Sequence, residues 1–126
     1  MIVMKENQNR NIQNVYRQIV EISKKYQVKK VVLFGSRARG TNMPKSDIDL
    51  AIYGCADFGG LSDSLNEDLW SLLKLDIINM DDKYVSSELV SEIEKDGVVL
   101  YEEYRFATEE EKQQLFDALA KKGKAW

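Results

Sequence analysis

Two aspartates separated by one residue carry the clearest chemical signal in the chain. Asp47 and Asp49 begin a segment that becomes wholly apolar through Tyr53, which predicts a strand. Side chains two apart on a strand share a face, so the two carboxylates are expected to project together, about 6–7 Å apart at Cα. Such a pair repels unless a proton or a metal neutralises it. A hard cation such as Mg²⁺ suits it; a solvated strand edge is the alternative.

A third acid, Asp76, opens another apolar segment, Leu75-Asp76-Ile77-Ile78. A charge among apolar residues needs either a partner or access to water. Because neighbouring strands lie only about 4.8 Å apart, Asp76 is placed to join the aspartate pair. The alternative is that it sits at the exposed mouth of its strand.

A glycine and a serine follow the apolar segment Val31-Val32-Leu33-Phe34 directly. Glycine allows a phosphate to approach the backbone, and a helix that begins here offers unpaired N–H donors to an anion. Gly35 and Ser36 are therefore candidate phosphate-binding residues, with a purely structural turn as the alternative. Arg37 and Arg39 are two apart on the expected short helix and cannot share one direction. Arg39 is the favoured phosphate contact, because it lies beside the loop that precedes Asp47.

The surrounding pattern alternates helices and strands. Ser36 is expected to cap the short helix, Gly40 to close it, and the leucines from Leu61 to Leu73, with Cys55, to lie in the core. The alternation predicts an α+β fold, a short mixed sheet flanked by helices, in a single domain spanning 1–126. The expected helices cover 9–26, 37–39, 61–73, 86–94 and about 108–122, and the expected strands cover 31–34, 47–53, 75–79 and 98–101.

Composition removes several classes of function. The chain has no histidine and one cysteine, so Ser–His–Asp or Cys–His catalysis, a Cys/His zinc site and an internal disulfide are all excluded. The single cysteine and the lack of a long apolar run favour a cytoplasmic protein without a membrane segment. The net charge of −3 argues against general nucleic-acid binding.

The two motifs together resemble the signature of the DNA polymerase β-like nucleotidyltransferase superfamily, most closely its minimal nucleotidyltransferase branch. The resemblance rests on Phe34-Gly35-Ser36-Arg37-Ala38-Arg39-Gly40 and Ser46-Asp47-Ile48-Asp49-Leu50-Ala51-Ile52, within a motif core of 31–101. It implies a polymerase β-like fold, Mg²⁺ as cofactor, with two ions, and ATP as substrate. It also implies that Gly35 and Ser36 bind the triphosphate. By the same resemblance Asp47 and Asp49 bind metal, and Asp76 activates the attacking hydroxyl or shares the metal.

Little of the chain remains to bind an acceptor, so the acceptor is expected to be small or to arrive as a partner protein. Members of this branch resemble antitoxins that are encoded beside a HEPN toxin. Such an antitoxin adenylylates a tyrosine of the toxin. The first hypothesis is therefore an adenylylating antitoxin. The alternatives are an antitoxin that neutralises its partner by contact alone, and an antibiotic-type enzyme that modifies a small molecule.

The C-terminal stretch divides into two sets of apolar side chains. One set has helical spacing and is assigned to the core: Leu115, Phe116 and Leu119. The other set is expected to contact the partner chain or a second copy of this one: Tyr104, Phe106 and Trp126.

Overall fold

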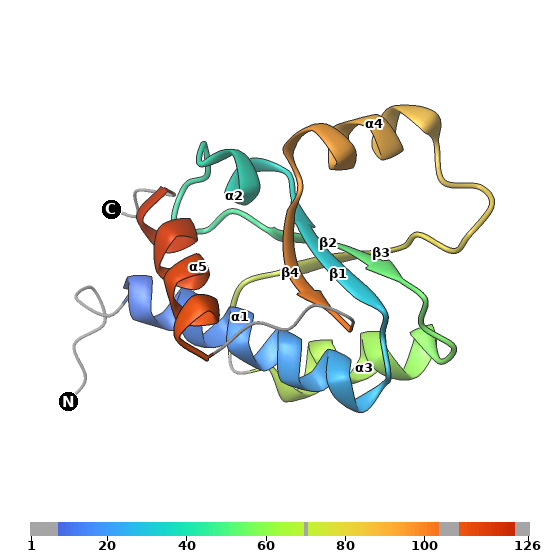
Figure 1. Cartoon of the computed structure of the whole chain (residues 1–126), viewed down its shortest axis with the longest axis horizontal. Coiled ribbons are helices and arrows are strands. Elements are labelled where there is room, and N and C mark those ends of the chain that lie inside the picture. The colour runs from blue at the N-terminus through green and yellow to red at the C-terminus, as the bar shows by residue number, and fades with distance from the viewer. Residues whose placement is uncertain (1–7, 70, 104–108, 123–126) are drawn as a thin grey trace.

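The computed structural model describes residues 8–69, 71–103 and 109–122 (Figure 1). The predicted α+β fold class is confirmed, and strands and helices alternate along the chain. In order, the elements are α1 (Gln8–Lys25), β1 (Lys30–Phe34), α2 (Ser36–Arg39), β2 (Ile48–Tyr53), α3 (Phe58–Asp68), β3 (Leu75–Asn79), α4 (Ser87–Asp96), β4 (Val98–Glu102) and α5 (Glu109–Lys122).

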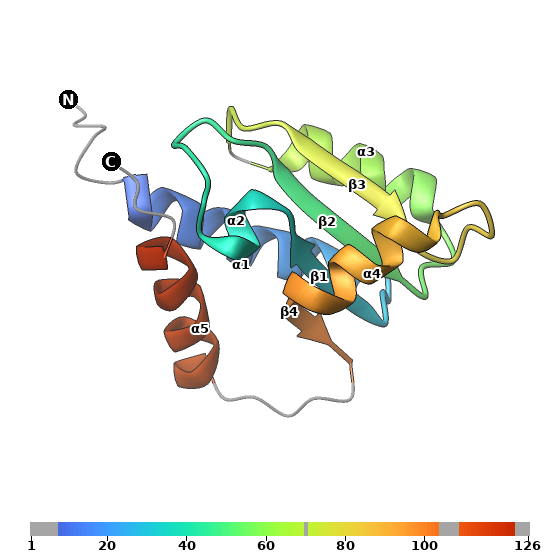
Figure 2. The same cartoon turned by 90° about the horizontal axis from the view of Figure 1, so that it is seen from above.

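The strands form a mixed sheet in the order β3-β2-β1-β4. β1 pairs antiparallel with both β2 and β4, whereas β2 and β3 run parallel. The register places Phe34 opposite Asp49, and Asp49 beside Asp76. Because the end of β1 lies beside the start of β2, the turn after β1 and the starts of β2 and β3 lie at the same end of the strands, as Figure 2 shows from above.

The two faces of the sheet have different coverings. Alternate strand residues, including Leu33, Leu50 and Ile77, pack with α1 and α3 in the larger apolar cluster. Their neighbours, including Phe34 and Ala51, pack with α4 in a smaller cluster. Figure 1 shows α1 and α3 below the sheet and α4 above it. The side chains of β2 and β3 that alternate with the larger cluster therefore face α4.

The last helix, α5, docks on α1 through aromatic packing. The Phe116 side chain is buried and its ring centroid lies 6.1 Å from that of Tyr16, with the Arg17 guanidinium 5.5 Å away. Gln13 adds a 2.6 Å hydrogen bond from its amide to Asp117 Oδ1. The core assignment is confirmed for Phe116 and Leu119, which are buried, while Leu115 is partly buried against the same cluster. The aromatic residues expected at an interface lie outside the described residues: Tyr104, Phe106 and Trp126.

Two local expectations were wrong. Ser36 is the first residue of α2 and not its cap; Gly35 occupies the cap position without a side-chain hydrogen bond. The leucine stripe also ends early, because Leu69 adopts an extended backbone and closes α3 at Asp68. Leu61 and Leu65 are fully buried as expected, but Leu72 is fully exposed. Within the described part of the chain, each helix is too short or too polar to span a bilayer.

The docking of α5 gives the first testable prediction. Phe116→Ala should lower the free energy of unfolding by about 3–5 kcal/mol, because it removes a fully buried ring and leaves a cavity against Tyr16. Urea denaturation measures the change. Gln114→Ala, an exposed position on the same helix, should change stability by less than about 0.5 kcal/mol. Equal stabilities for the two variants would show that α5 does not belong to the cooperative core.

Candidate active site

The turn after β1 brings the backbone against an aspartate. Gly35 has φ 74° and ψ −156°, a region that is essentially restricted to glycine. A Cβ atom built at Gly35 would overlap Oδ2 of Asp49, which lies opposite Phe34 in the register. Glycine is therefore required here by its conformation and by the close approach of the carboxylate. Whether this turn binds a triphosphate stays a prediction.

Asp49 and Asp76 share the α4 face of the sheet, and Asp47 lies close to Asp49 in the chain. Asp49 and Asp76 are direct neighbours on parallel strands, so their Cα atoms are about 4.8 Å apart. Each precedes a residue of the opposite cluster, Leu50 and Ile77, and so both face α4. Asp47 lies just before β2, two residues ahead of Asp49. Asp49 is partly buried, whereas Asp47 and Asp76 are exposed.

Burial and neighbouring acids together perturb one of these aspartates strongly. The pKa of Asp49 is raised from 3.8 to about 6, mainly by burial and then by the negative charges of Asp76, Asp47 and Glu92. Arg39 opposes the shift, since its positive charge favours the carboxylate. The site therefore holds more negative charge than its own cation neutralises.

This excess of oxygen donors and negative charge fits a hard divalent cation. Asp47, Asp49 and Asp76 are the residues that would hold it, and their role as ligands stays a prediction. Within the described ranges, no three Asp, Glu, Cys or His side chains are already close enough together to hold a metal ion. Mutual repulsion of uncompensated carboxylates favours such a spread arrangement.

Arg39 and Glu92 form the upper rim of the site. Arg39 Nη1 lies 3.6 Å from Glu92 Oε2, and both side chains are about two-fifths exposed, so the pair itself adds little stability. The positive charge of Arg39 acts on Asp49, and its expected contact with phosphate stays a prediction. Glu92 was not identified from the sequence, because it is one of several acids on an amphipathic helix and no motif distinguishes it.

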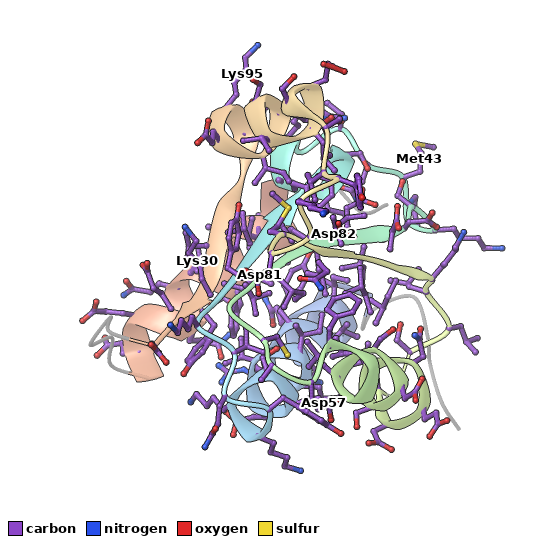
Figure 3. The ribbon with its side chains drawn as sticks, turned by 90° about the vertical axis from the view of Figure 1, so that its right-hand side faces the viewer. Lys30, Met43, Asp57, Asp81, Asp82 and Lys95 are labelled. Atoms are coloured by element: carbon purple, nitrogen blue, oxygen red, sulfur yellow. The ribbon has the colours of Figure 1, made fainter. Side chains whose placement is uncertain are left out.

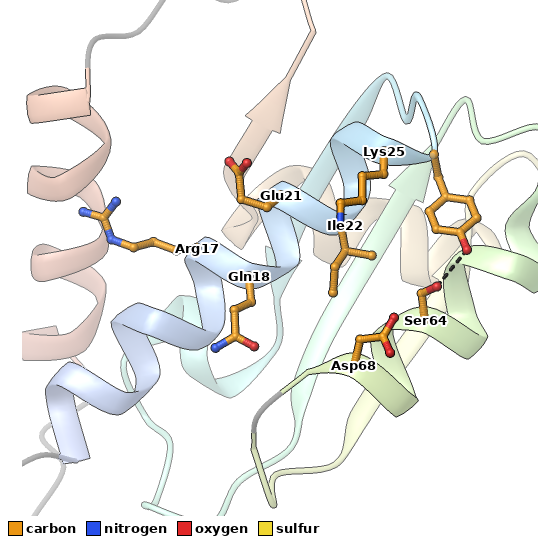
Figure 4. A pocket seen from close by; sticks show the side chains of 8 residues that line it. Arg17, Gln18, Glu21, Ile22, Lys25, Ser64 and Asp68 are labelled. Atoms are coloured by element: carbon orange, nitrogen blue, oxygen red, sulfur yellow. Dashed lines mark hydrogen bonds between the residues drawn. The ribbon is translucent and has the colours of Figure 1, made fainter.

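A groove lies elsewhere on the molecule. About 540 Å³ of space opens between α1 and α3, on the face of the sheet opposite Asp49 and Asp76. Figure 4 shows its charged lining, with Glu21 and Lys25 from α1 and Asp68 from α3, and the hydrogen bond between Ser64 and Tyr26. Acidic and basic side chains balance in this groove, so it offers no field that would attract a nucleotide. It is a separate surface from the candidate active site.

The raised pKa of Asp49 predicts how stability depends on pH without metal. Between about pH 4 and pH 6 the folded state holds a proton that the unfolded state releases, so stability falls as pH rises through this window. Asp49→Asn should remove that decline and make the metal-free protein more stable at pH 7.5. Urea unfolding at several pH values in EDTA measures this, with the exposed Asp63→Asn as control. If the stability of Asp49→Asn depended on pH as that of the wild type does, the raised pKa assigned to Asp49 would be contradicted.

The requirement for glycine predicts a local effect of adding one methyl group. Gly35→Ala should lose about 2 kcal/mol of stability from backbone strain alone, and it should displace Asp49. Gly59→Ala is the matched control, since a Cβ at Gly59 meets nothing within 4 Å and alanine favours the helix. Thermal unfolding compares the two variants. A Gly35→Ala protein as stable as the wild type would rule out the described turn.

Comparison with solved structures establishes the fold. A crystal structure of a toxin–antitoxin with AMP-PNP has a TM-score of 0.55 and 22% identity, over 83% of this chain and 82% of that chain. A mutant of the toxin–antitoxin MntA–HpeT gives 0.53 and 18%, over 83% and 82%. A nucleotidyltransferase from Sulfolobus solfataricus, described as putative, gives 0.52 and 20%, over 80% and 90%. At these identities the likeness concerns the fold alone.

Comparison of sequences identifies the family. No curated protein matches the chain. Residues 17–105, which include β1, α2, β2, β3 and β4, match the family described as "Polymerase beta, Nucleotidyltransferase". This match covers more than half of the chain and contains all three aspartates together with Gly35. The chain therefore belongs to the polymerase β nucleotidyltransferase family.

Proposed function

We propose that this protein is a Mg²⁺-dependent nucleotidyltransferase that transfers AMP from ATP to a hydroxyl group of a partner protein. The observation that carries the proposal is the pairing of Asp49 with Asp76 across parallel strands, with Asp47 two residues away and Gly35 against the carboxylate. A structural role explains this arrangement poorly, because burial and the neighbouring acids raise the pKa of Asp49 and so oppose folding at neutral pH.

The reaction follows from the roles that these residues can take. The acceptor oxygen forms a bond to the α-phosphorus of ATP, the bond from that phosphorus to the pyrophosphate oxygen breaks, and pyrophosphate leaves. Asp76 is exposed and beside the reacting edge, so it is assigned as the base that takes the hydroxyl proton. Bound Mg²⁺ would supply charge neutralisation for the phosphates and both reacting oxygens. Arg39 is assigned to the phosphates, since it already lies within electrostatic reach of Asp49.

The partner is proposed to be a HEPN-domain toxin, with a tyrosine as acceptor and this chain as the antitoxin. Two considerations support this. The helices and strands of the described residues belong to the sheet and its covering layers, so the acceptor is proposed to lie on another protein. Two of the solved structures with the same fold are described as toxin–antitoxin proteins, one of them with AMP-PNP.

A transfer assay with matched variants tests the chemistry. The wild type, Mg²⁺ and ATP should add the mass of AMP to the HEPN partner, located on a tyrosine by peptide mass spectrometry. Asp47→Asn or Asp49→Asn should lower the rate about 1,000-fold, because losing about 4 kcal/mol of charge stabilisation has that effect. Both variants should remain folded. Asp63→Asn makes the same chemical change on the surface of α3 and should keep full activity.

The same assay separates the alternatives. Full activity in both site variants would end the catalytic assignment. Neutralisation of the toxin with no nucleotide added would favour an antitoxin that acts by contact, and a nucleotide found on a small hydroxyl compound would favour an antibiotic-type enzyme. Supplying each NTP in turn identifies the nucleotide from the mass that is added.

A further inference from the structure

A buried arginine stands directly beneath the loop that delivers Asp47. Arg37 is the second residue of α2, and only 6% of it is exposed. Within the described residues, no carboxylate forms an ion pair with it; its guanidinium donates to neutral oxygens instead. Burying a charged group this way is costly, so its hydrogen bonds must be well made to be tolerated.

The hydrogen bonds of Arg37 converge on one short stretch of backbone. Nη2 donates to the carbonyl of Pro44 at 3.0 Å and to that of Ser46 at 3.0 Å, and Nε donates to Ser46 at 3.1 Å. A planar guanidinium is suited to such multiple contacts, which fix orientation as well as distance. Ser46 is the residue immediately before Asp47, so the chain is held one peptide unit away from a candidate metal ligand.

The loop closes upon itself around the same point. The amide of Met43 donates to Ser46 Oγ at 2.9 Å, and the amide of Ser46 donates to the Met43 carbonyl at 3.1 Å. This turn leaves Met43 projecting into solvent, as Figure 3 shows. Beyond Asp47, the amide of Ile48 donates to the Lys74 carbonyl. Asp47 is therefore held between two fixed points, the turn bound by Arg37 and the first ladder bond to the β3 side.

The guanidinium also lies near a buried residue of α1. Burial raises the pKa of the Tyr16 hydroxyl, and the nearby positive charge of Arg37 opposes that shift. The Tyr16 ring packs against Phe116 of α5. Tyr16, Phe116 and Ala38 of α2 belong to one core cluster, so α2 is seated on the buried core.

We propose that Arg37 is a positioning residue of the transfer reaction: it fixes the carbonyls of Pro44 and Ser46 and thereby the place of Asp47 beside Asp49. The inference rests on the proposed function for its catalytic consequence, but its structural part is independent of turnover. Arg37 touches neither nucleotide nor metal in this role. Arg39, which follows two residues later, points instead toward Glu92 and the open side of the site.

Amide hydrogen exchange tests the structural part without any substrate. Arg37→Met keeps the length of the side chain and removes the hydrogen bonds, so exchange over residues 43–48 should rise about 10-fold, while α3 amides stay unchanged. Leu65→Ala is the matched control, because it destabilises the buried core on α3 without touching the loop. Equal exchange over 43–48 in wild type and Arg37→Met would overturn the proposal.

Metal binding and kinetics test the catalytic part. Titration with Mn²⁺ should show affinity about 10-fold weaker in Arg37→Met, as for other residues that orient a ligand. The kcat for AMP transfer should fall about 100-fold, with KM for ATP changed less than about 3-fold. Leu65→Ala, assayed well below its melting temperature, should keep the wild-type Mn²⁺ affinity and kcat. Wild-type values for folded Arg37→Met would refute a positioning role.

Two milder variants cover the case in which Arg37→Met does not fold. Tyr16→Phe removes only the hydroxyl, and Arg37→Lys keeps a charge but cannot bridge both carbonyls. Each should shift exchange, Mn²⁺ affinity and kcat in the same direction by smaller factors, and unchanged values in both would contradict the proposal. If the wild type transfers no nucleotide while loop exchange and Mn²⁺ affinity still respond to Arg37→Met, the proposed function fails and the positioning of Asp47 stands.

Discussion

The partial burial of Asp49 beside other acids is the constraint on which the candidate site depends. The sheet places the Cα atoms of Asp49 and Asp76 about 4.8 Å apart, because β2 and β3 are parallel and in register. Gly35 then closes over the same carboxylate and helps to bury it. Burial and the neighbouring negative charges both raise the Asp49 pKa, so keeping this carboxylate ionised in the folded state lowers the stability of the protein.

The two faces of the sheet differ in their packing and in their charge. On the α1 and α3 face, β1 and β2 contribute fully buried side chains such as Leu33 and Leu50 to a continuous apolar cluster. On the α4 face the apolar cluster is smaller, and the edge beyond it carries the acids. Packing on one face thus offsets electrostatic strain on the other, and alternation along β2 assigns each residue to its face.

The sequence alone predicted much of the fold, because its signals are local. The period-two alternation around Asp49 and the spacing of Phe116 and Leu119 predict which way side chains face. The apolar run before Gly35 predicts a buried strand. The pairing of Asp49 with Asp76 could be predicted for a different reason. Two acids at the equivalent starts of neighbouring strands become neighbours once those strands pair in parallel.

What the sequence did not predict depends on longer-range contacts. Glu92 acts on Asp49 only because the fold brings α4 beside Arg39 of α2, and nothing in the helix distinguishes it from neighbouring acids. Leu72 fits the leucine spacing of α3, yet the helix has already ended at Asp68 and the residue is exposed. Helix propensity and apolar periodicity do not locate the residue at which the backbone leaves the helix.

Arg37 shows how such long-range contacts bear on chemistry. In sequence it is one of two similar arginines on a four-residue helix, and the local pattern cannot say which one faces the interior. The distinction arises from the carbonyls of Pro44 and Ser46, in the loop that follows, which accept the hydrogen bonds of Arg37. The guanidinium of Arg37 donates to neutral backbone oxygens, and within the described chain it has no carboxylate partner. Its contribution is therefore geometric, whereas that of Arg39, exposed and within reach of Asp49, is electrostatic.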